Sequence, residues 1–75
     1  MKVYVLNRIN GIENHIYGIF SSLEQADFAM TNLLNKFSET ILDADYNTND
    51  DTWLYFTDNS TYQIKVMFIN SNAGM

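Results

Sequence analysis

Apolar and polar residues alternate over the first twenty positions of the chain, and the pair Asn10-Gly11 interrupts the alternation. A period of two is typical of a half-buried β-strand, and Asn-Gly supplies the two positive-φ residues of a type I′ turn. The pattern therefore predicts a β-hairpin whose register is set by this turn. The side expected to face the core pairs Ile9 with Ile12, Val5 with Ile16 and Val3 with Gly18. The opposite side pairs Arg8 with Glu13, Leu6 with His15 and Tyr4 with Tyr17.

A helix is expected next, because Ser21 stands three residues before Glu24, which is the spacing of a capping box. Apolar residues then recur at steps of three and four, so that a helix would carry them on one face. This stripe comprises Leu23, Ala26, Met30, Leu33, Leu34 and Phe37. Phe28 lies off the stripe and is either a residue at the edge of the core or a contact residue.

Beyond Ser38 the period of two returns, since Leu42, Ala44 and Tyr46 alternate with Ile41, Asp43 and Asp45. Two more strands are predicted over 53–57 and 62–69, on either side of a turn at Asp58-Asn59-Ser60. Residues 70–75 are expected to form a frayed tail. The chain 1–75 is thus predicted to be a single α+β domain of two layers. One helix would pack on a mostly antiparallel five-strand sheet in the order β-β-α-β-β-β.

The last hairpin can form in two registers that differ by one residue. In the favoured register a three-residue loop places Leu54 and Phe56 in the core, together with Ile64, Val66 and Phe68. Trp53 and Tyr55 then lie on the open face of the sheet, beside Gln63, Lys65 and Met67. The alternative register places Trp53 and Tyr55 in the core, and Leu54 and Phe56 on the open face.

One helix covers one side of a five-strand sheet, so the other side should be polar, yet the pattern leaves aromatic residues there. These predicted contact residues are Tyr4, Tyr17, Trp53 and Tyr55. Tyr and Trp offer a large rigid contact area with a polar end, and exposed patches of them mark interaction surfaces. Three interpretations stay open: the patch is covered within the fold, it forms a homodimer interface, or it binds a foreign partner.

Nine carboxylates against four basic residues give a net charge of −5, which disfavours direct binding to nucleic acid or to an anionic membrane. A partner protein with a basic surface fits better. The negative charge gathers at one end of the predicted meander, at Asp43, Asp45, Asp50, Asp51 and Asp58. The chain has no cysteine, no apolar run of membrane-spanning length and no signal-peptide pattern at its start, so a cytoplasmic protein is expected.

The sequence offers few residues in patterns that are typical of catalytic sites. There is no cysteine, His15 lacks a pattern that would place a serine and a carboxylate beside it, and no glycine-rich phosphate loop occurs. We therefore expect neither an enzyme nor a cofactor. Oxygen donors at Asp43, Asp45, Asn47, Asn49 and Asp51 resemble the start of an EF-hand calcium loop. That motif then fails, since Thr48 stands where it needs glycine and Leu54 where it needs glutamate, so no metal site is predicted.

The segments 2–6 (KVYVL) and 18–26 (GIFSSLEQA) resemble the opening of short uncharacterised bacterial and phage proteins, written KVYVL…GxFSSxExA. This resemblance implies a small strand, strand, helix, strand fold and no established activity. It also suggests a phage or mobile-element origin, where small acidic proteins block host nucleic-acid enzymes; that step is analogy.

Two functional hypotheses follow. The first is a non-catalytic protein-binding module, a small acidic phage-type inhibitor of a host defence or nucleic-acid enzyme. In it, Tyr4, Tyr17, Trp53 and Tyr55 anchor the partner, while Asp43, Asp45, Asp50 and Asp51 steer it. The second is a homo-oligomer that binds a small ligand through the same aromatic residues between subunits.

Overall fold

Five strands and one helix make up residues 1–69, the part of the chain that the computed structural model describes. The elements are β1 (Lys2–Asn10), β2 (Glu13–Phe20), α1 (Leu23–Lys36), β3 (Ile41–Asn47), β4 (Thr52–Thr57) and β5 (Thr61–Phe68). Their order and the antiparallel pairing of every neighbouring strand confirm the predicted α+β fold. The predicted frayed tail, 70–75, lies outside the described residues.

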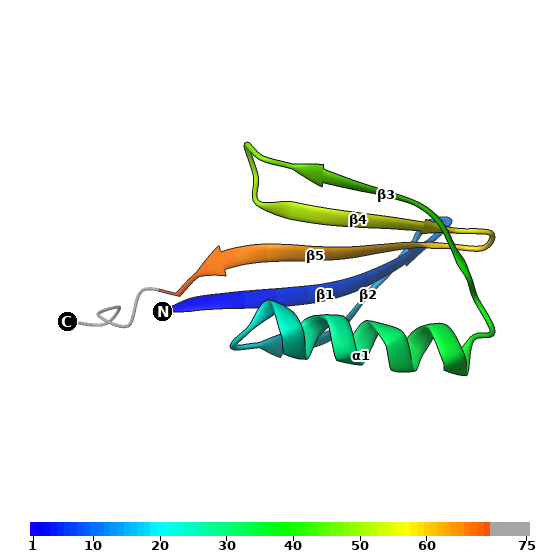
Figure 1. The fold of residues 1–75 in the computed structure, drawn as a ribbon, viewed down its shortest axis with the longest axis horizontal. Helices are drawn as coiled ribbons and strands as arrows, with labels where there is room; N and C mark the ends of the chain where they lie inside the picture. The colour runs from blue at the N-terminus through cyan, green and yellow to red at the C-terminus, as the bar shows by residue number, and fades with distance from the viewer. Residues whose placement is uncertain (70–75) are drawn as a thin grey trace.

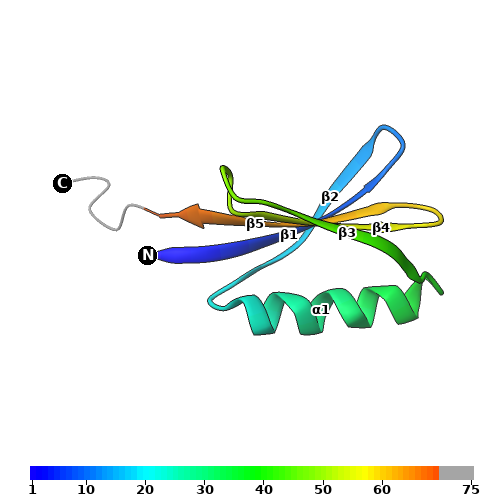
Figure 2. The same ribbon diagram turned by 45° about the horizontal axis from the view of Figure 1, so that its top comes forward.

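The sheet has the strand order β2-β1-β5-β4-β3, and α1 lies along one of its faces (Figures 1 and 2). The helix comes close to β2, β1 and β5, whereas β4 and β3 extend past it (Figure 1). The side of the β3–β4 hairpin that faces the helix layer is therefore left largely uncovered. Among the described residues, no helix combines the length and the apolar character needed to cross a membrane.

The first hairpin closes one residue later than predicted. Gly11 and Ile12 form the loop, and Asn10 pairs with Glu13 as the last residue of its strand. Within this loop the positive φ, 62°, belongs to Gly11, which adopts it without steric cost. A bulge in β2 at Tyr17 then shifts the register again, so the predicted cross-strand pairs are wrong.

The face of β1 that meets the helix is the opposite of the predicted one. Val3 and Val5, predicted in the core, are buried, but on the face away from the helix. Leu6, predicted outside, is 0% exposed and packs with Ala26 and Met30 of α1, whereas Ile16, predicted in the core, is 64% exposed. The reason lies at Arg8, which shares the face of Leu6 and can turn inward because a carboxylate of another segment neutralises it. The rest of the core cluster comes from β5, as Tyr62 and Ile64.

The helix begins one residue later than the capping-box pattern indicated. Its N-cap is Ser22, whose hydroxyl accepts a hydrogen bond from the Gln25 backbone N–H at 3.2 Å. Gln25 takes the role predicted for Glu24, since its side-chain oxygen accepts from the backbone N–H of Ser21 at 3.3 Å. The apolar stripe is confirmed: Ala26 and Met30 are buried, and Leu23, Leu33 and Leu34 pack against the core cluster.

The last hairpin adopts the alternative register. Trp53 pairs with Ile64 and Tyr55 with Tyr62, so both aromatic residues lie on the helix side of the sheet. The favoured register, with Leu54 and Phe56 in the core, is therefore wrong. Ile64 and Val66 are buried as predicted, so the slip is in β4, where the Thr57 hydroxyl donates to a buried carboxylate on the helix side and shares the face of Trp53 and Tyr55.

Candidate functional site

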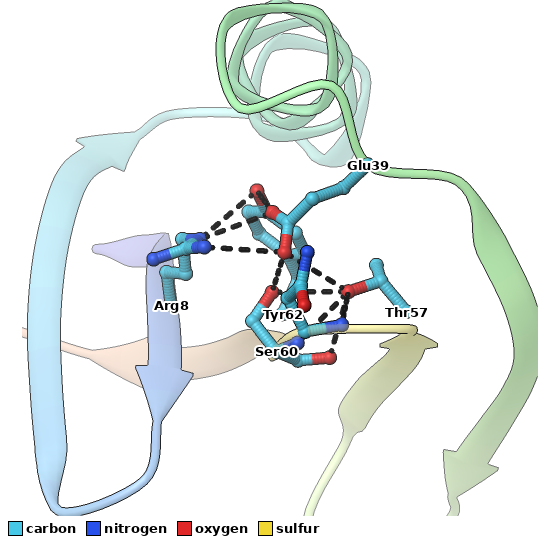
Figure 3. Close-up of polar contacts among 6 residues, drawn as sticks. Arg8, Glu39, Thr57, Ser60 and Tyr62 are labelled. Atoms are coloured by element: carbon cyan, nitrogen blue, oxygen red, sulfur yellow. Dashed lines mark hydrogen bonds and ion pairs between the residues drawn. The ribbon is translucent and has the colours of Figure 1, made fainter.

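The connection after α1 fixes the position of a buried carboxylate, Glu39. Ser38 has a φ of 54°, and the backbone N–H groups of Ser38 and Glu39 donate to the carbonyls of Asn35 and Leu34 at 3.3 and 2.8 Å. These two bonds form a Schellman motif, which ends a helix by turning the chain sharply through a left-handed residue. Glu39 consequently points from the helix end toward the sheet (Figure 3).

Glu39 is the centre of a buried polar network, shown in Figure 3, that joins β1, β4 and β5 to the end of the helix. Its carboxylate accepts two hydrogen bonds from the Arg8 guanidinium, both 3.1 Å long. The hydroxyls of Tyr62, Ser60 and Thr57 donate to it at 2.5, 2.7 and 3.1 Å. The Glu39 side chain is 0% exposed and that of Arg8 11% exposed.

Within residues 1–69, no buried side-chain nitrogen or oxygen lacks a hydrogen-bond partner, and this holds for the network as well. Burial by itself raises the pKa of Glu39, but the hydrogen bonds from Arg8 and the three hydroxyls outweigh it and lower the pKa to about 2. Burial and the bond to Glu39 raise the pKa of Tyr62 to about 12. The network thus contains an ionised carboxylate and a neutral phenol, which are hydrogen-bonded to each other. These features favour a structural clamp over a reactive site.

We expect the protein to lose stability in acid because of Glu39. Its pKa lies near 2 in the folded state against an ordinary value of 4.5, so its contribution is full above about pH 4.5 and is lost as the pH falls through about 2. The free energy of unfolding, measured by urea denaturation at pH values from 6 to 2, should fall across this window. A free energy that stays flat from pH 5 to 2 would contradict the ionised clamp.

A second feature lies at the opposite end of β4. A hollow of about 420 Å³, here called the aromatic hollow, opens on the helix-side face of the β3–β4 hairpin. Its lining residues are Ala44, Asp45, Tyr46, Trp53 and Tyr55. The Trp53 ring lies 4.8 Å from the Tyr46 ring and 6.3 Å from the Tyr4 ring, centroid to centroid.

The hollow exists because a small residue stands among large ones. Tyr46 pairs with Trp53 across the two strands, and Ala44 pairs with Tyr55. Ala44 thus occupies the position where a fourth large side chain would fill the space between the rings. Figure 1 shows that α1 does not extend over this hairpin, so the helix does not cover this part of the sheet.

Carboxylates surround the aromatic hollow. The Tyr46 hydroxyl donates to Asp51 at 2.7 Å, and this bond raises the pKa of Tyr46. Burial and the negative charge of Asp27, on α1, raise the pKa of Tyr55. Asp51 and Asp27 thus give the hollow a negative potential.

Three of the four predicted aromatic contact residues come together here, although on the helix side of the sheet and not on its open face. Tyr4, Trp53 and Tyr55 are half-buried and border the core cluster. Tyr17 lies apart from them: it is 39% exposed and its ring packs on Phe37, 6.4 Å away. The predicted pair of Tyr4 with Tyr17 is wrong, because Tyr4 pairs with Phe20.

The predicted acidic residues divide between the two faces of the β3–β4 hairpin. Asp43 and Asp45 pair with Phe56 and Leu54 on the face away from the helix, and each carboxylate accepts the backbone N–H of the next residue. Asp51 lies in the turn, with a φ of 47°, and is the predicted acidic residue that bonds a ring of the hollow. Asp50 accepts a 3.4 Å hydrogen bond from the Asn47 side chain.

Sequence reasoning missed Ala44, Tyr46 and Asp27 as parts of this site. The alternation of residues 42–46 did place Ala44 and Tyr46 on one face, which was the available signal. No sequence signal pointed to Asp27, since its approach to Tyr55 depends on how the helix crosses the sheet.

The residues considered for metal binding and catalysis do not form a cluster. Within residues 1–69, no group of three or more His, Asp or Glu side chains converges. His15 lies 3.2 Å from Glu13 on the exposed surface of β2. The side-chain oxygen of Asn47 accepts the backbone N–H of Asn49, so this part of the acidic stretch supports its own turn.

A groove of about 560 Å³ runs beside α1 near the end of β2. Its lining residues are Phe20, Glu24, Gln25, Phe28, Ala29 and Asn32. Phe28 is 70% exposed there, so it is a surface residue and not part of the core edge.

The fold and its two features define the class: an α+β domain with a buried polar clamp at one end of β4 and an open aromatic hollow at the other. Comparisons of the chain with protein-family models, with curated proteins and with solved structures find no match. The function is therefore argued from the site alone.

Proposed function

We propose that this protein is a non-catalytic binding module that holds a partner protein on the aromatic hollow. The observation that carries the proposal is the group of Tyr46, Trp53 and Tyr55, which lines a hollow on a hairpin that α1 does not cover. Aromatic side chains at the centre of an interface contribute most of its binding energy, because they bury large rigid surfaces.

The charge of the protein supports a basic partner. The net charge is −5, and Asp27 and Asp51 bring carboxylates to the hollow itself. Such a surface speeds association with positively charged surfaces and repels nucleic acid. The setting that we propose is a small phage-type inhibitor that covers a basic site of a host defence or nucleic-acid enzyme.

The proposal is tested by comparing two exposed tyrosines. Tagged wild-type protein captures candidate partners, and the affinity of each purified partner is then measured for Tyr46→Ser and Tyr17→Ser, residues 43% and 39% exposed. We expect Tyr46→Ser to weaken binding by about tenfold or more, as loss of an interface hot spot does. Tyr17→Ser, which removes an equally exposed ring outside the hollow, should change the affinity less than about threefold.

The same purified pair tests the charges. We expect the association rate to fall as sodium chloride rises from low to physiological concentration, because salt screens the carboxylates around the hollow. Partners that bind both tyrosine variants equally well would exclude the hollow as the binding surface. A salt-independent association rate would exclude the electrostatic part of the proposal.

A further inference from the structure

Three of the four cations of this chain lie over aromatic rings, and none of the three lies over a ring that lines the aromatic hollow. The Arg8 guanidinium lies 4.1 Å from the centre of the Phe37 ring, and the Lys36 ammonium lies 5.6 Å from it. The Lys2 ammonium lies 5.6 Å from the ring of Tyr4, at the border of the hollow. Lys65, the remaining basic residue, pairs with Val5 on the opposite face of the sheet.

The hollow itself combines two features that attract a cation. Three aromatic rings, those of Trp53, Tyr46 and Tyr55, line it, and aromatic rings attract cations, Trp most strongly. Carboxylates supply the opposite charge beside it, since Asp51 accepts a hydrogen bond from the Tyr46 hydroxyl and the negative charge of Asp27 acts on Tyr55. All four basic residues of the chain are among the described residues. Those that lie over a ring lie over Tyr4, Phe37 or Tyr62, which do not line the hollow.

We infer that the aromatic hollow binds one cationic side chain of the partner, an arginine or a lysine, with its charged group over the Trp53 ring and beside the carboxylates. This inference rests on the proposed function, since it names the partner group that the hollow holds. The open space above Ala44 would accept the alkyl stem of that side chain.

The experiment uses the full chain and three capped tripeptides, Gly-X-Gly, in which X is arginine, lysine or the neutral citrulline. Trp53 is the single tryptophan, so its fluorescence reports directly on the hollow. At constant ionic strength we expect a saturable fluorescence change with the arginine and lysine peptides and none with the citrulline peptide. The ratio of the affinities for the arginine and lysine peptides shows which side chain the hollow prefers, since a planar guanidinium stacks on rings and an ammonium does not.

A filling variant and a matched control locate the effect. Ala44→Leu should occupy the hollow and weaken the peptide response by about tenfold, the size of a partly desolvated cation–π contact. Gln63→Leu adds the same side chain to the other face of the sheet and should leave the response unchanged. Urea denaturation of both variants confirms that each is folded.

The outcomes separate this inference from the proposed function. Equal responses to citrulline and arginine, or an unchanged response in Ala44→Leu, would overturn the cation site. If partner binding still depended on Tyr46, the proposed function would survive that result. The reverse result is selective binding of the cationic peptides together with a partner affinity that Tyr46→Ser does not change. It would support the cation site and overturn the proposed function.

Discussion

Replacing Glu39 with Gln should destabilise the protein by about 3–5 kcal/mol, the typical result of removing one partner from a buried ion pair. The Arg8 side chain, 11% exposed, would keep its charge in the interior without the carboxylate that neutralises it. The hydroxyls of Tyr62 and Ser60 would also lose an ionised acceptor. Urea denaturation followed by the fluorescence of Trp53 measures the loss.

The exposed ion pair of the first hairpin provides the control. Glu13 lies 3.2 Å from His15, and its side chain is 70% exposed. Glu13→Gln should therefore cost less than about 1 kcal/mol, because water screens a surface pair. Similar losses in the two variants would mean that Glu39 does not hold the fold together.

The clamp also bears on the binding surface. Its hydroxyls come from the end of β4 and from the β4–β5 turn, at Thr57 and Ser60, and its carboxylate lies just before β3. The β3–β4 hairpin carries the aromatic hollow but lies outside the reach of α1. The buried network is thus the contact that ties this hairpin to the end of the helix (Figure 3).

Leu6→Ala should cost about 2–5 kcal/mol of stability, since it opens a cavity in the core. Leu6 is 0% exposed and packs with residues of both α1 and β5, so the surrounding side chains cannot close the gap without moving the helix. The transition midpoint in urea should fall while the slope of the transition is unchanged.

Ile16 is the matched control for this substitution. It is an aliphatic residue of the neighbouring strand, and the sequence pattern placed it in the core, yet it is 64% exposed. Ile16→Ala should change the stability by less than about 1 kcal/mol, because little apolar surface is buried there. A larger loss at Ile16 than at Leu6 would restore the face assignment that the sequence alone predicted.

Local patterns determined the elements of this protein. Periods of two and of three to four residues located the helix and the strands, because those periods reflect which side chains share a face within one element. These periods predicted the apolar stripe of α1, the strand that begins at Ile41 and the order of helix and strands along the chain. A pattern of this kind is local and needs no knowledge of the rest of the fold.

Tertiary contacts decided which face of each strand is the interior. Alternation shows that two faces exist, and a one-residue slip exchanges them without changing the pattern. In β1 and β4 the choice goes with the contacts of Arg8 and Thr57 to Glu39, residues that are distant in sequence and meet only in the folded chain. A lone arginine or glutamate is expected outside, so no local pattern favoured placing that side of β1 against the helix.

The candidate site divides in the same way. Its aromatic residues were recognisable from composition, since Tyr4, Trp53 and Tyr55 are large amphipathic side chains on predicted strands. Their gathering around Ala44 was not, because it requires the register of β3 against β4 and a helix that stops short of both. The sequence by itself determined that aromatic and acidic groups were available on the sheet. Only the tertiary structure decided where they meet, because that position depends on strand register and on the path of the helix.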